Sequence, residues 1–223
     1  NILDLNSGTI PSSYWISVKI SVASAALGCL IGFGMAAAVV FGAVRSPRIF
    51  DIMSSFPKPV IAMINGFCLG GGAELAYAAD FRIGTPSVRI GNPETGLGIL
   101  AAAGASWRLK ELVGEPVAKE ILLAGAVLRA ERALAVNLIT EIHEAPELMA
   151  AAHALADRIA GQDPLAVRIT KSVFHAPAEA HPLIDQLAQG ILFESQAKFD
   201  RMQLFLDKKA AKKSATKSEQ EKN

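Results

Sequence analysis

The sequence of residues 59–76 is PVIAMINGFCLGGGAELA, and this stretch decides the fold. Pro59–Ile64 is a continuous apolar run bounded by proline and by an Asn-Gly pair, which predicts a strand buried on both faces in a parallel sheet. Three glycines, Gly70–Gly72, then lead into the helix-forming residues Ala73–Ala79. Phe81–Gly84 returns as a strand, so the stretch predicts a βαβ unit within an α/β fold.

The glycine turn has a chemical use as well as a structural one. Glycines allow a ligand to come close to the backbone, and the first N–H groups of a helix have no intrahelical partner. Together with the helix dipole, these donors suit an oxygen that becomes negative in a transition state. We therefore expect Gly71 N–H to be an oxyanion donor; the alternative is that Gly70–Gly72 only permits tight strand-to-helix packing.

Two carboxylates accompany the turn. Glu74 stands in the first helical turn and Glu94 lies in Gly91-Asn92-Pro93-Glu94. Each is ordinary alone, since acids stabilise helix starts and occur in surface turns. If the two converge on the oxyanion donor, they can hold one water molecule, and one can take its proton while the other protonates carbon. The pair thus predicts addition of water across a double bond.

These residues resemble the signature of the crotonase (enoyl-CoA hydratase/isomerase) superfamily, closest to the enoyl-CoA hydratases. The resemblance implies an α/β fold of the crotonase-like ββα spiral type, with a C-terminal helical trimerisation region, homotrimers often paired into hexamers, and an acyl-CoA thioester substrate. It covers about residues 56–206 and rests on Lys58–Ala76, Asp80, Gly91–Glu94, Arg108-Leu109, Leu112–Gly114 and Leu122–Gly125.

The resemblance also implies roles for individual residues. Gly71 N–H would be one oxyanion donor, and Leu69, Gly70 and Gly71 would bind the substrate. Glu94 would protonate the α-carbon while Glu74 activates water, hydrating 2-enoyl-CoA to 3-hydroxyacyl-CoA. No cofactor or metal is expected, because CoA is part of the substrate. The alternatives are an enoyl-CoA isomerase or acyl-CoA hydrolase that uses one glutamate, and a non-catalytic acyl-CoA-binding relative.

The chain departs from the family pattern in two places. The Ala-Gly-Ala-Asp-like loop that carries the second oxyanion amide of relatives is not found between Ile20 and Asp51, and the upstream half is short. Where relatives often have Pro-Gly-Ala-Gly-Gly, Leu100–Ser106 is LAAAGAS, which would reshape the acyl pocket. Losing one donor can cost about 10²–10³ in rate. Three explanations stay open: an amide near Gly32–Ala38 replaces this donor, residues are missing from the sequence, or the protein is a weakened relative.

The N-terminal part is atypical. Tyr14–Val22 alternates apolar and other residues, which predicts a strand. Ile20–Val44 carries no charge and is long enough to cross a bilayer, but its Gly and Ala content and the overlapping strand favour a buried strand-turn-helix. The chain begins at Asn1 rather than Met, which predicts a fragment or processed form, and no signal-peptide pattern precedes the strand.

Composition excludes several classes of protein. The 223 residues are 51% hydrophobic and 19% charged, with net charge +1, which predicts one globular domain and no nucleic-acid partner. The two cysteines lie in apolar runs, as buried thiols do. No histidine has metal-ligand spacing. A membrane location is disfavoured, and a bacterial cytoplasm or, second, a mitochondrial matrix is expected. The basic residues near the motif, expected to be solvated or structural, are Lys58, Arg82 and Arg108.

The part of the chain after the glutamate motifs is expected to be mostly helical, and the whole chain is expected to consist of four segments. We expect an atypical N-terminal part at 1–50, an acyl-CoA-binding core at 51–182, a C-terminal helix for oligomer contact at 183–207 and a Lys-rich disordered tail at 208–223. The predicted helices are Ser106–Val113, Glu115–Ala124, Ala130–Asn137, Glu147–Ala160, a helix from Pro164 to about Phe174 capped by Asp163, and Leu183–Leu206.

Overall fold

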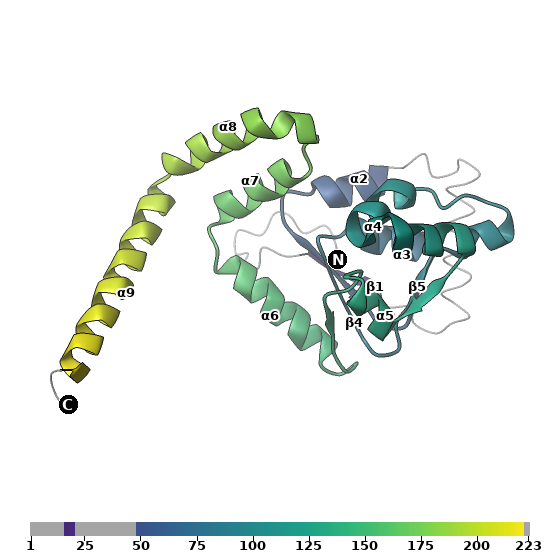
Figure 1. Cartoon of the computed structure of the whole chain (residues 1–223), viewed down its shortest axis with the longest axis horizontal. Coiled ribbons are helices and arrows are strands. Elements are labelled where there is room, and N and C mark those ends of the chain that lie inside the picture. The colour runs from purple at the N-terminus through teal and green to yellow at the C-terminus, as the bar shows by residue number, and fades with distance from the viewer. Residues whose placement is uncertain (1–15, 21–47, 221–223) are drawn as a thin grey trace, which may run out of the picture. The chain divides into compact units, whose positions relative to one another are not determined.

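The structure, a computed structural model, describes residues 16–20 and 48–220 and the side chains of 49–211 (Figure 1). The strands are β1 (Ile16–Ile20), β2 (Val60–Ile64), β3 (Phe67–Leu69), β4 (Phe81–Gly84), β5 (Arg89–Gly91), β6 (Val127–Arg129) and β7 (Glu141–Ile142). The helices are α2 (Arg48–Ser55), α3 (Gly71–Ala78), α4 (Ala105–Ala124), α5 (Ala130–Ala135), α6 (Leu148–Ala160), α7 (Pro164–Phe174), α8 (His181–Phe193) and α9 (Gln196–Gln220), with 3₁₀ turns η1 (Pro93–Leu97) and η2 (Ala178–Ala180).

The first sheet has the order β1-β2-β4-β7, and all its pairs are parallel. Every residue of β2 is buried, which confirms the prediction from its apolar run. Val60, Ala62 and Ile64 belong to the main core cluster, whereas Ile61 and Met63 pack with α6. Helices therefore cover both faces of β2 (Figure 1), as a parallel sheet requires.

The second sheet is smaller and has the order β3-β5-β6, with β3 parallel to β5 and β6 antiparallel to β5. Each turn of the chain thus places one strand in each sheet before a helix: β2, β3 and α3, then β4, β5 and α4. This confirms the predicted ββα spiral. The short strand β3 lies between the two strands of the predicted βαβ unit. The sequence does not predict it, because its three residues are too few to show a period.

Most helix predictions are confirmed. The two helices expected on either side of Gly114 are present as the two halves of α4, which meet at a kink where Gly114 adopts the non-helical φ 77° and ψ 163°. The helix expected to reach Asn137 ends at Ala135, because Asn137 adopts a left-handed φ of 59°. Asp163 caps α7 as predicted, accepting a hydrogen bond from Ala166 N at 2.7 Å.

The chain divides into two compact units, the first ending at Gly161 and the second starting at Gln162. The expected boundary after residue 182 therefore falls inside the second unit, which contains α7, α8 and α9. The predicted helix Leu183–Leu206 is two helices. Ser195 interrupts it and accepts a hydrogen bond from Lys198 N at 3.3 Å, as an N-cap does.

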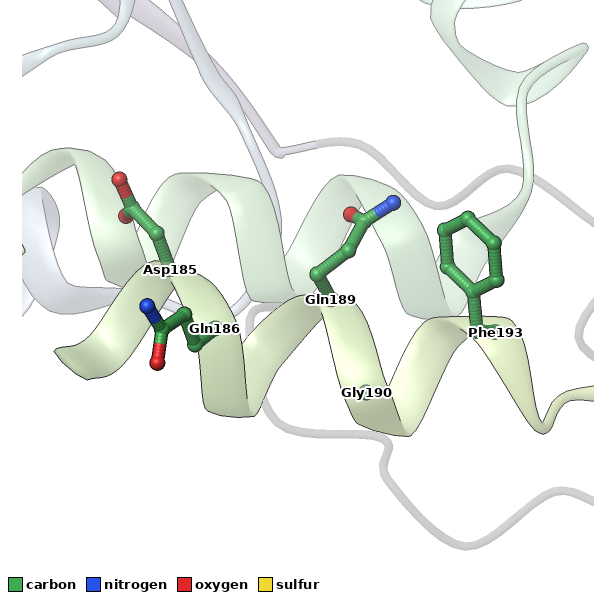
Figure 2. A pocket seen from close by; sticks show the side chains of 5 residues that line it. All are labelled: Asp185, Gln186, Gln189, Gly190 and Phe193. Atoms are coloured by element: carbon green, nitrogen blue, oxygen red, sulfur yellow. The ribbon is translucent and has the colours of Figure 1, made fainter. Parts of the chain in front are cut away.

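The C-terminal segment differs from its prediction as well. We expected a disordered tail from 208, but α9 continues to Gln220. The physical reason is that Ala, Lys, Glu and Gln are strong helix formers. On α8, a hollow is lined by Asp185, Gln186, Gln189, Gly190 and Phe193, and Figure 2 shows Asp185, Gln189 and Phe193 on one side of the helix.

The structure describes only part of the N-terminal segment, so only some of the predictions for it can be compared with the structure. β1 lies within the predicted strand Tyr14–Val22 and pairs with β2, with Ile16 opposite Val60. The uncharged segment Ile20–Val44 lies almost wholly outside the described residues. Among the helices that the structure describes, none is long and apolar enough to cross a membrane. Cys68 is a buried free thiol, as expected, and burial raises its pKa to about 12.

Candidate active site

The two glutamate-bearing segments meet because two parallel strands end together. In the second sheet Leu69 of β3 pairs with Gly91 of β5, and Gly70 N donates to Gly91 O at 3.0 Å. The chain after β3 becomes α3, which carries Glu74, and the chain after β5 becomes η1, which carries Glu94. The strand register therefore brings both predicted carboxylates to the amino end of α3.

Gly70 is the point of contact between the two segments. It precedes α3 with φ 55° and ψ −126°, a conformation that is essentially restricted to glycine. A Cβ at this position would lie 2.7 Å from Glu94 Oε1, so the backbone of Gly70 lies directly against that carboxylate. The group that comes close to the Gly70 backbone is Glu94, while the approach of a ligand to the glycine turn stays a prediction.

Gly71 and Gly72 are different. A Cβ at either position would have no described heavy atom within 4 Å, and both residues are partly exposed. Tight packing against the rest of the described chain therefore does not explain these two glycines. Gly71 is the first residue of α3, where N–H groups have no intrahelical partner. The space on the Cβ side of these two glycines is thus open among the described residues, and Gly71 N–H stays the predicted oxyanion donor.

Glu74 is buried, with 6% of its surface exposed. Burial, followed by the nearby charge of Glu94, raises the pKa of the Glu74 carboxyl to about 7, and a hydrogen bond from the Ala102 backbone opposes the rise. Glu94 Oε1 lies against Gly70, the residue directly before the helix that carries Glu74. A carboxyl group of this pKa exchanges protons readily at neutral pH.

Glu94 differs from Glu74 in its hydrogen bonding. Its Oε2 atom is buried and has no hydrogen-bond partner among the described residues, and the same holds for Nδ2 of the fully buried Asn92. The Oδ1 atom of Asn92 accepts a hydrogen bond from Tyr77 OH at 2.8 Å. Burial, and to a smaller extent the charges of Cys68, Glu94 and Glu74, raise the pKa of the Tyr77 phenol well above its ordinary value. Unpaired polar atoms of this kind need a ligand or water to bond.

Sequence reasoning missed Tyr77, Asn92 and Ala102. Tyr77 and Asn92 both lie within segments that the sequence analysis considered. The signal for Tyr77 was a polar side chain in an apolar run, and the signal for Asn92 was a polar side chain directly after a strand. Ala102 acts through its backbone, and backbone contacts leave no trace in residue type. The missing second oxyanion amide was sought near Gly32–Ala38, which lies outside the described residues.

Of the basic residues near the motif, two have structural roles. Arg82 is buried and donates to the carbonyl oxygens of Leu138 at 2.8 Å and Ala79 at 2.6 Å, so it binds the end of α3. Burial lowers its pKa to about 10, while Asp80 opposes the change. Arg108 is buried too and pairs with Asp51 at 3.0 Å. The part of the chain that the structure describes contains no cluster of side chains suited to hold a metal ion.

Comparison with known proteins agrees with this geometry. A family model described as enoyl-CoA hydratase/isomerase matches residues 46–214. The chain is 36% identical over 175 residues to a crotonyl-CoA hydratase of Syntrophomonas wolfei, a match covering 77% of this chain and 67% of that protein. It is 34% identical over 166 residues to a short-chain-enoyl-CoA hydratase of Clostridium acetobutylicum, covering 73% and 64%.

Solved structures give the same result. The crystal structure of an enoyl-CoA hydratase from Bacillus anthracis superposes with a TM-score of 0.69 at 31% identity, covering 73% of this chain and 64% of that one. A Geobacillus kaustophilus structure superposes with a TM-score of 0.70 at 30% identity, covering 76% and 68%. The chain thus spans about two thirds of the length of its relatives. From its fold, its site and these matches, the chain belongs to the enoyl-CoA hydratase/isomerase family, the crotonase superfamily.

Proposed function

We propose that this protein hydrates 2-enoyl-CoA thioesters to 3-hydroxyacyl-CoA. The observation that carries the proposal is the meeting of Glu74 and Glu94 at the open amino end of α3. Relatives named as crotonyl-CoA and short-chain-enoyl-CoA hydratases support this choice of substrate. The reaction needs no cofactor or metal, because the thioester itself activates the double bond.

The chemistry follows from the position of each group. The thioester oxygen accepts a hydrogen bond from Gly71 N–H, which stabilises the negative charge that develops there. Glu74 takes a proton from water as the water oxygen bonds to C3, and the electrons of the double bond move toward the thioester oxygen. Glu94, which must carry a proton before the reaction while Glu74 is ionised, then supplies that proton to C2. The proton left on Glu74 returns to Glu94 after product release, so that water has been added and the pair is restored.

The pKa of Glu74 gives this proposal a pH dependence. As a base Glu74 must be deprotonated, and its pKa is about 7. We therefore expect kcat to fall as the pH decreases below about 7. A profile that stays flat down to the ordinary range of glutamate would contradict Glu74 as the base.

Two isosteric variants test the proposal directly. Glu74→Gln and Glu94→Gln keep the shape of the side chain and remove its proton transfer, so each should lower kcat for crotonyl-CoA hydration by about 10²–10⁴-fold. Glu111→Gln, an exposed glutamate of α4, is the matched control. Unchanged turnover in both site variants would exclude the mechanism. Assays with a 3-enoyl-CoA separate hydratase from isomerase, because only an isomerase converts it to the 2-enoyl product.

Assembly belongs to the same proposal. We propose that the second unit forms the contact of a homotrimer or hexamer, because α8 and α9 expose many large apolar side chains. Leu187 and Phe205 are each 60% exposed, and the others include Leu183, Ile191, Phe199 and Met202. Light scattering should give a trimer or hexamer mass for the wild type and a smaller species for Leu187→Gln. A monomeric wild type would contradict the proposal.

A further inference from the structure

Asn92 occupies the N-cap position of η1, the turn that carries Glu94. An asparagine at an N-cap ordinarily accepts a hydrogen bond from a backbone N–H of its own helical turn. In η1 the Asn92 side chain makes no such capping bond. Its Oδ1 atom instead accepts a hydrogen bond from the hydroxyl of Tyr77, with 2.8 Å between the two oxygens. The start of the Glu94 turn is therefore held by α3 rather than by its own cap.

The hydrogen bond between Tyr77 and Asn92 is buried, since Tyr77 is 4% exposed and Asn92 is 0% exposed. Away from water, neither group has a solvent partner to replace the other, so the loss of one leaves the other unsatisfied. The Nδ2 atom of Asn92 has no hydrogen-bond partner among the described residues. The contact with Tyr77 therefore constrains the orientation of the Asn92 amide and, with it, the backbone at the start of η1.

Tyr77 lies on the same face of α3 as Glu74. The two residues follow each other at a spacing of i and i+3, which places side chains on neighbouring turns of one helix face. On the other side of the contact, Pro93 is the one residue between Asn92 and Glu94, and its ring fixes φ in that short connection. The segment that carries Glu94 is therefore held against the face of α3 that carries Glu74.

Two further contacts hold the same segment at the start of α3. Gly70 N donates to Gly91 O at 3.0 Å, and Glu94 Oε1 lies against the backbone of Gly70. Both are made at the residue that precedes the helix, whereas Tyr77 holds the segment from within the helix. The contacts are thus spread along α3, and removal of the Tyr77 hydroxyl would leave the two at its amino end.

We propose that Tyr77 is a positioning residue of the hydration site, which acts through Asn92 to hold the Glu94 carboxyl at a fixed distance from the base. Two carboxyl groups can share one water molecule only within a narrow range of separations, because the water must reach both by hydrogen bonds. The inference rests on the proposed function for its kinetic consequence only. Its structural part, the control of the distance between the two carboxyl groups by Tyr77, is independent of the substrate.

The kinetic test removes the hydroxyl with Tyr77→Phe, which keeps the aromatic ring. For crotonyl-CoA hydration, this variant should lower kcat by at least about 10-fold and change KM less than about 3-fold, because the carboxyl pair is misplaced while the glycine turn is intact. Thr85→Val is the matched control. It also removes a buried hydroxyl, but that hydroxyl contacts Ser87 Oγ at 2.7 Å and Asn65 Oδ1 at 3.3 Å, outside the two glutamate-bearing segments. Thr85→Val should match the wild type, and an equal loss of kcat in both variants would contradict the proposal.

The link through Asn92 is tested by Asn92→Leu, alone and combined with Tyr77→Phe. If the hydroxyl acts through Asn92, the double variant should have a kcat within about 2-fold of Asn92→Leu alone, since the same link is lost in both. Losses that multiply would contradict the proposal. The double variant replaces both partners with apolar groups of similar shape and leaves neither unsatisfied, so it is the variant to use where a single variant does not fold.

A titration of carboxyl ¹³C signals gives a readout that does not need activity. Glu74 is assigned by the Glu74→Gln spectrum, and its pKa is measured with and without Glu94→Gln. The difference between the two values reports the interaction of the two carboxyl groups. It should shrink by at least about half when Tyr77→Phe is added, because the two like charges can then move apart, and it should be unchanged by Thr85→Val.

A smaller difference in Tyr77→Phe supports the proposal even if the wild type has no hydratase activity, which would refute only the proposed function. An undiminished difference in Tyr77→Phe overturns it. If Tyr77→Phe does not fold, the same titration is made on the double variant with Asn92→Leu, with the same criterion.

Discussion

Glu74 and Glu94 are the same residue type at the same end of α3, yet their surroundings differ. Glu74 is buried within a regular helix, and its carboxyl accepts a hydrogen bond from the Ala102 backbone. Glu94 lies in a short 3₁₀ turn against the backbone of Gly70, and its buried Oε2 atom has no partner in the part of the chain that the structure describes. One carboxyl is thus held by the protein, while the other keeps an oxygen available for a ligand or water.

This difference teaches how one fold can give two identical side chains separate tasks. A carboxyl that the helix and the Ala102 amide hold in place suits the base, because its position and ionisation are both controlled. A carboxyl with a free buried oxygen suits the group that contacts the substrate. The following variants change one side of the comparison at a time.

Gly70→Ala should have the largest effect on stability. The Gly70 conformation of φ 55° and ψ −126° is strained for any residue with a Cβ, at a cost of about 1–3 kcal/mol. The added methyl would also lie 2.7 Å from Glu94 Oε1 and displace that carboxyl. Urea unfolding should show a loss in this range, accompanied by reduced hydration activity. A loss below about 0.5 kcal/mol would show that the glycine turn is not strained.

Glu74→Gln should increase stability at alkaline pH. Folding raises the pKa of Glu74 from 4.5 to about 7, so the folded state binds its proton more tightly than the unfolded state does. The wild type therefore loses stability as the pH rises through this window, and the full penalty applies above pH 7. Urea unfolding at pH 8 should show the variant about 1–3 kcal/mol more stable. The two proteins should converge below pH 4.5, and a constant difference across pH would contradict the assignment.

Glu94→Gln should act on Glu74 through its missing charge. The Glu94 carboxylate opposes ionisation of Glu74, so a neutral glutamine should lower the pKa of Glu74 below about 7, while the effect of burial remains. Carboxyl ¹³C titration measures the change, with Glu111→Gln as the control. An unchanged pKa would mean that the two side chains are too far apart to share a water molecule.

Gly71→Ala should have the smallest effect on stability. Its Cβ would meet no described atom within 4 Å, so urea unfolding should change by less than about 0.5 kcal/mol. Binding of crotonyl-CoA, measured by calorimetry, should nevertheless weaken, because the methyl enters the space proposed for the thioester. A loss of stability as large as that of Gly70→Ala would show that this space is filled by protein.

The sequence located the local features of the core well. The run Pro59–Ile64 predicts a buried strand, which is β2, and Gly70–Gly72 predicts the turn that leads into a helix, since apolar pattern and glycine act over a few residues. The C-terminal part was harder to predict. The cap at Ser195 splits one expected helix in two, and the lysine-rich segment is helical to Gln220, because propensity alone suffices there.

For the site, the sequence alone pointed to the residues that are proposed to carry the chemistry, namely the glycine turn, Glu74 and Glu94, and to their family. Only the tertiary structure decided how they meet. The pairing of Leu69 with Gly91 brings the two segments together, and burial with the nearby charge of Glu94 raises the pKa of Glu74. The physical reason is range: turn and helix signals act between neighbours in sequence, whereas strand register, burial and backbone donors depend on residues far apart in the chain.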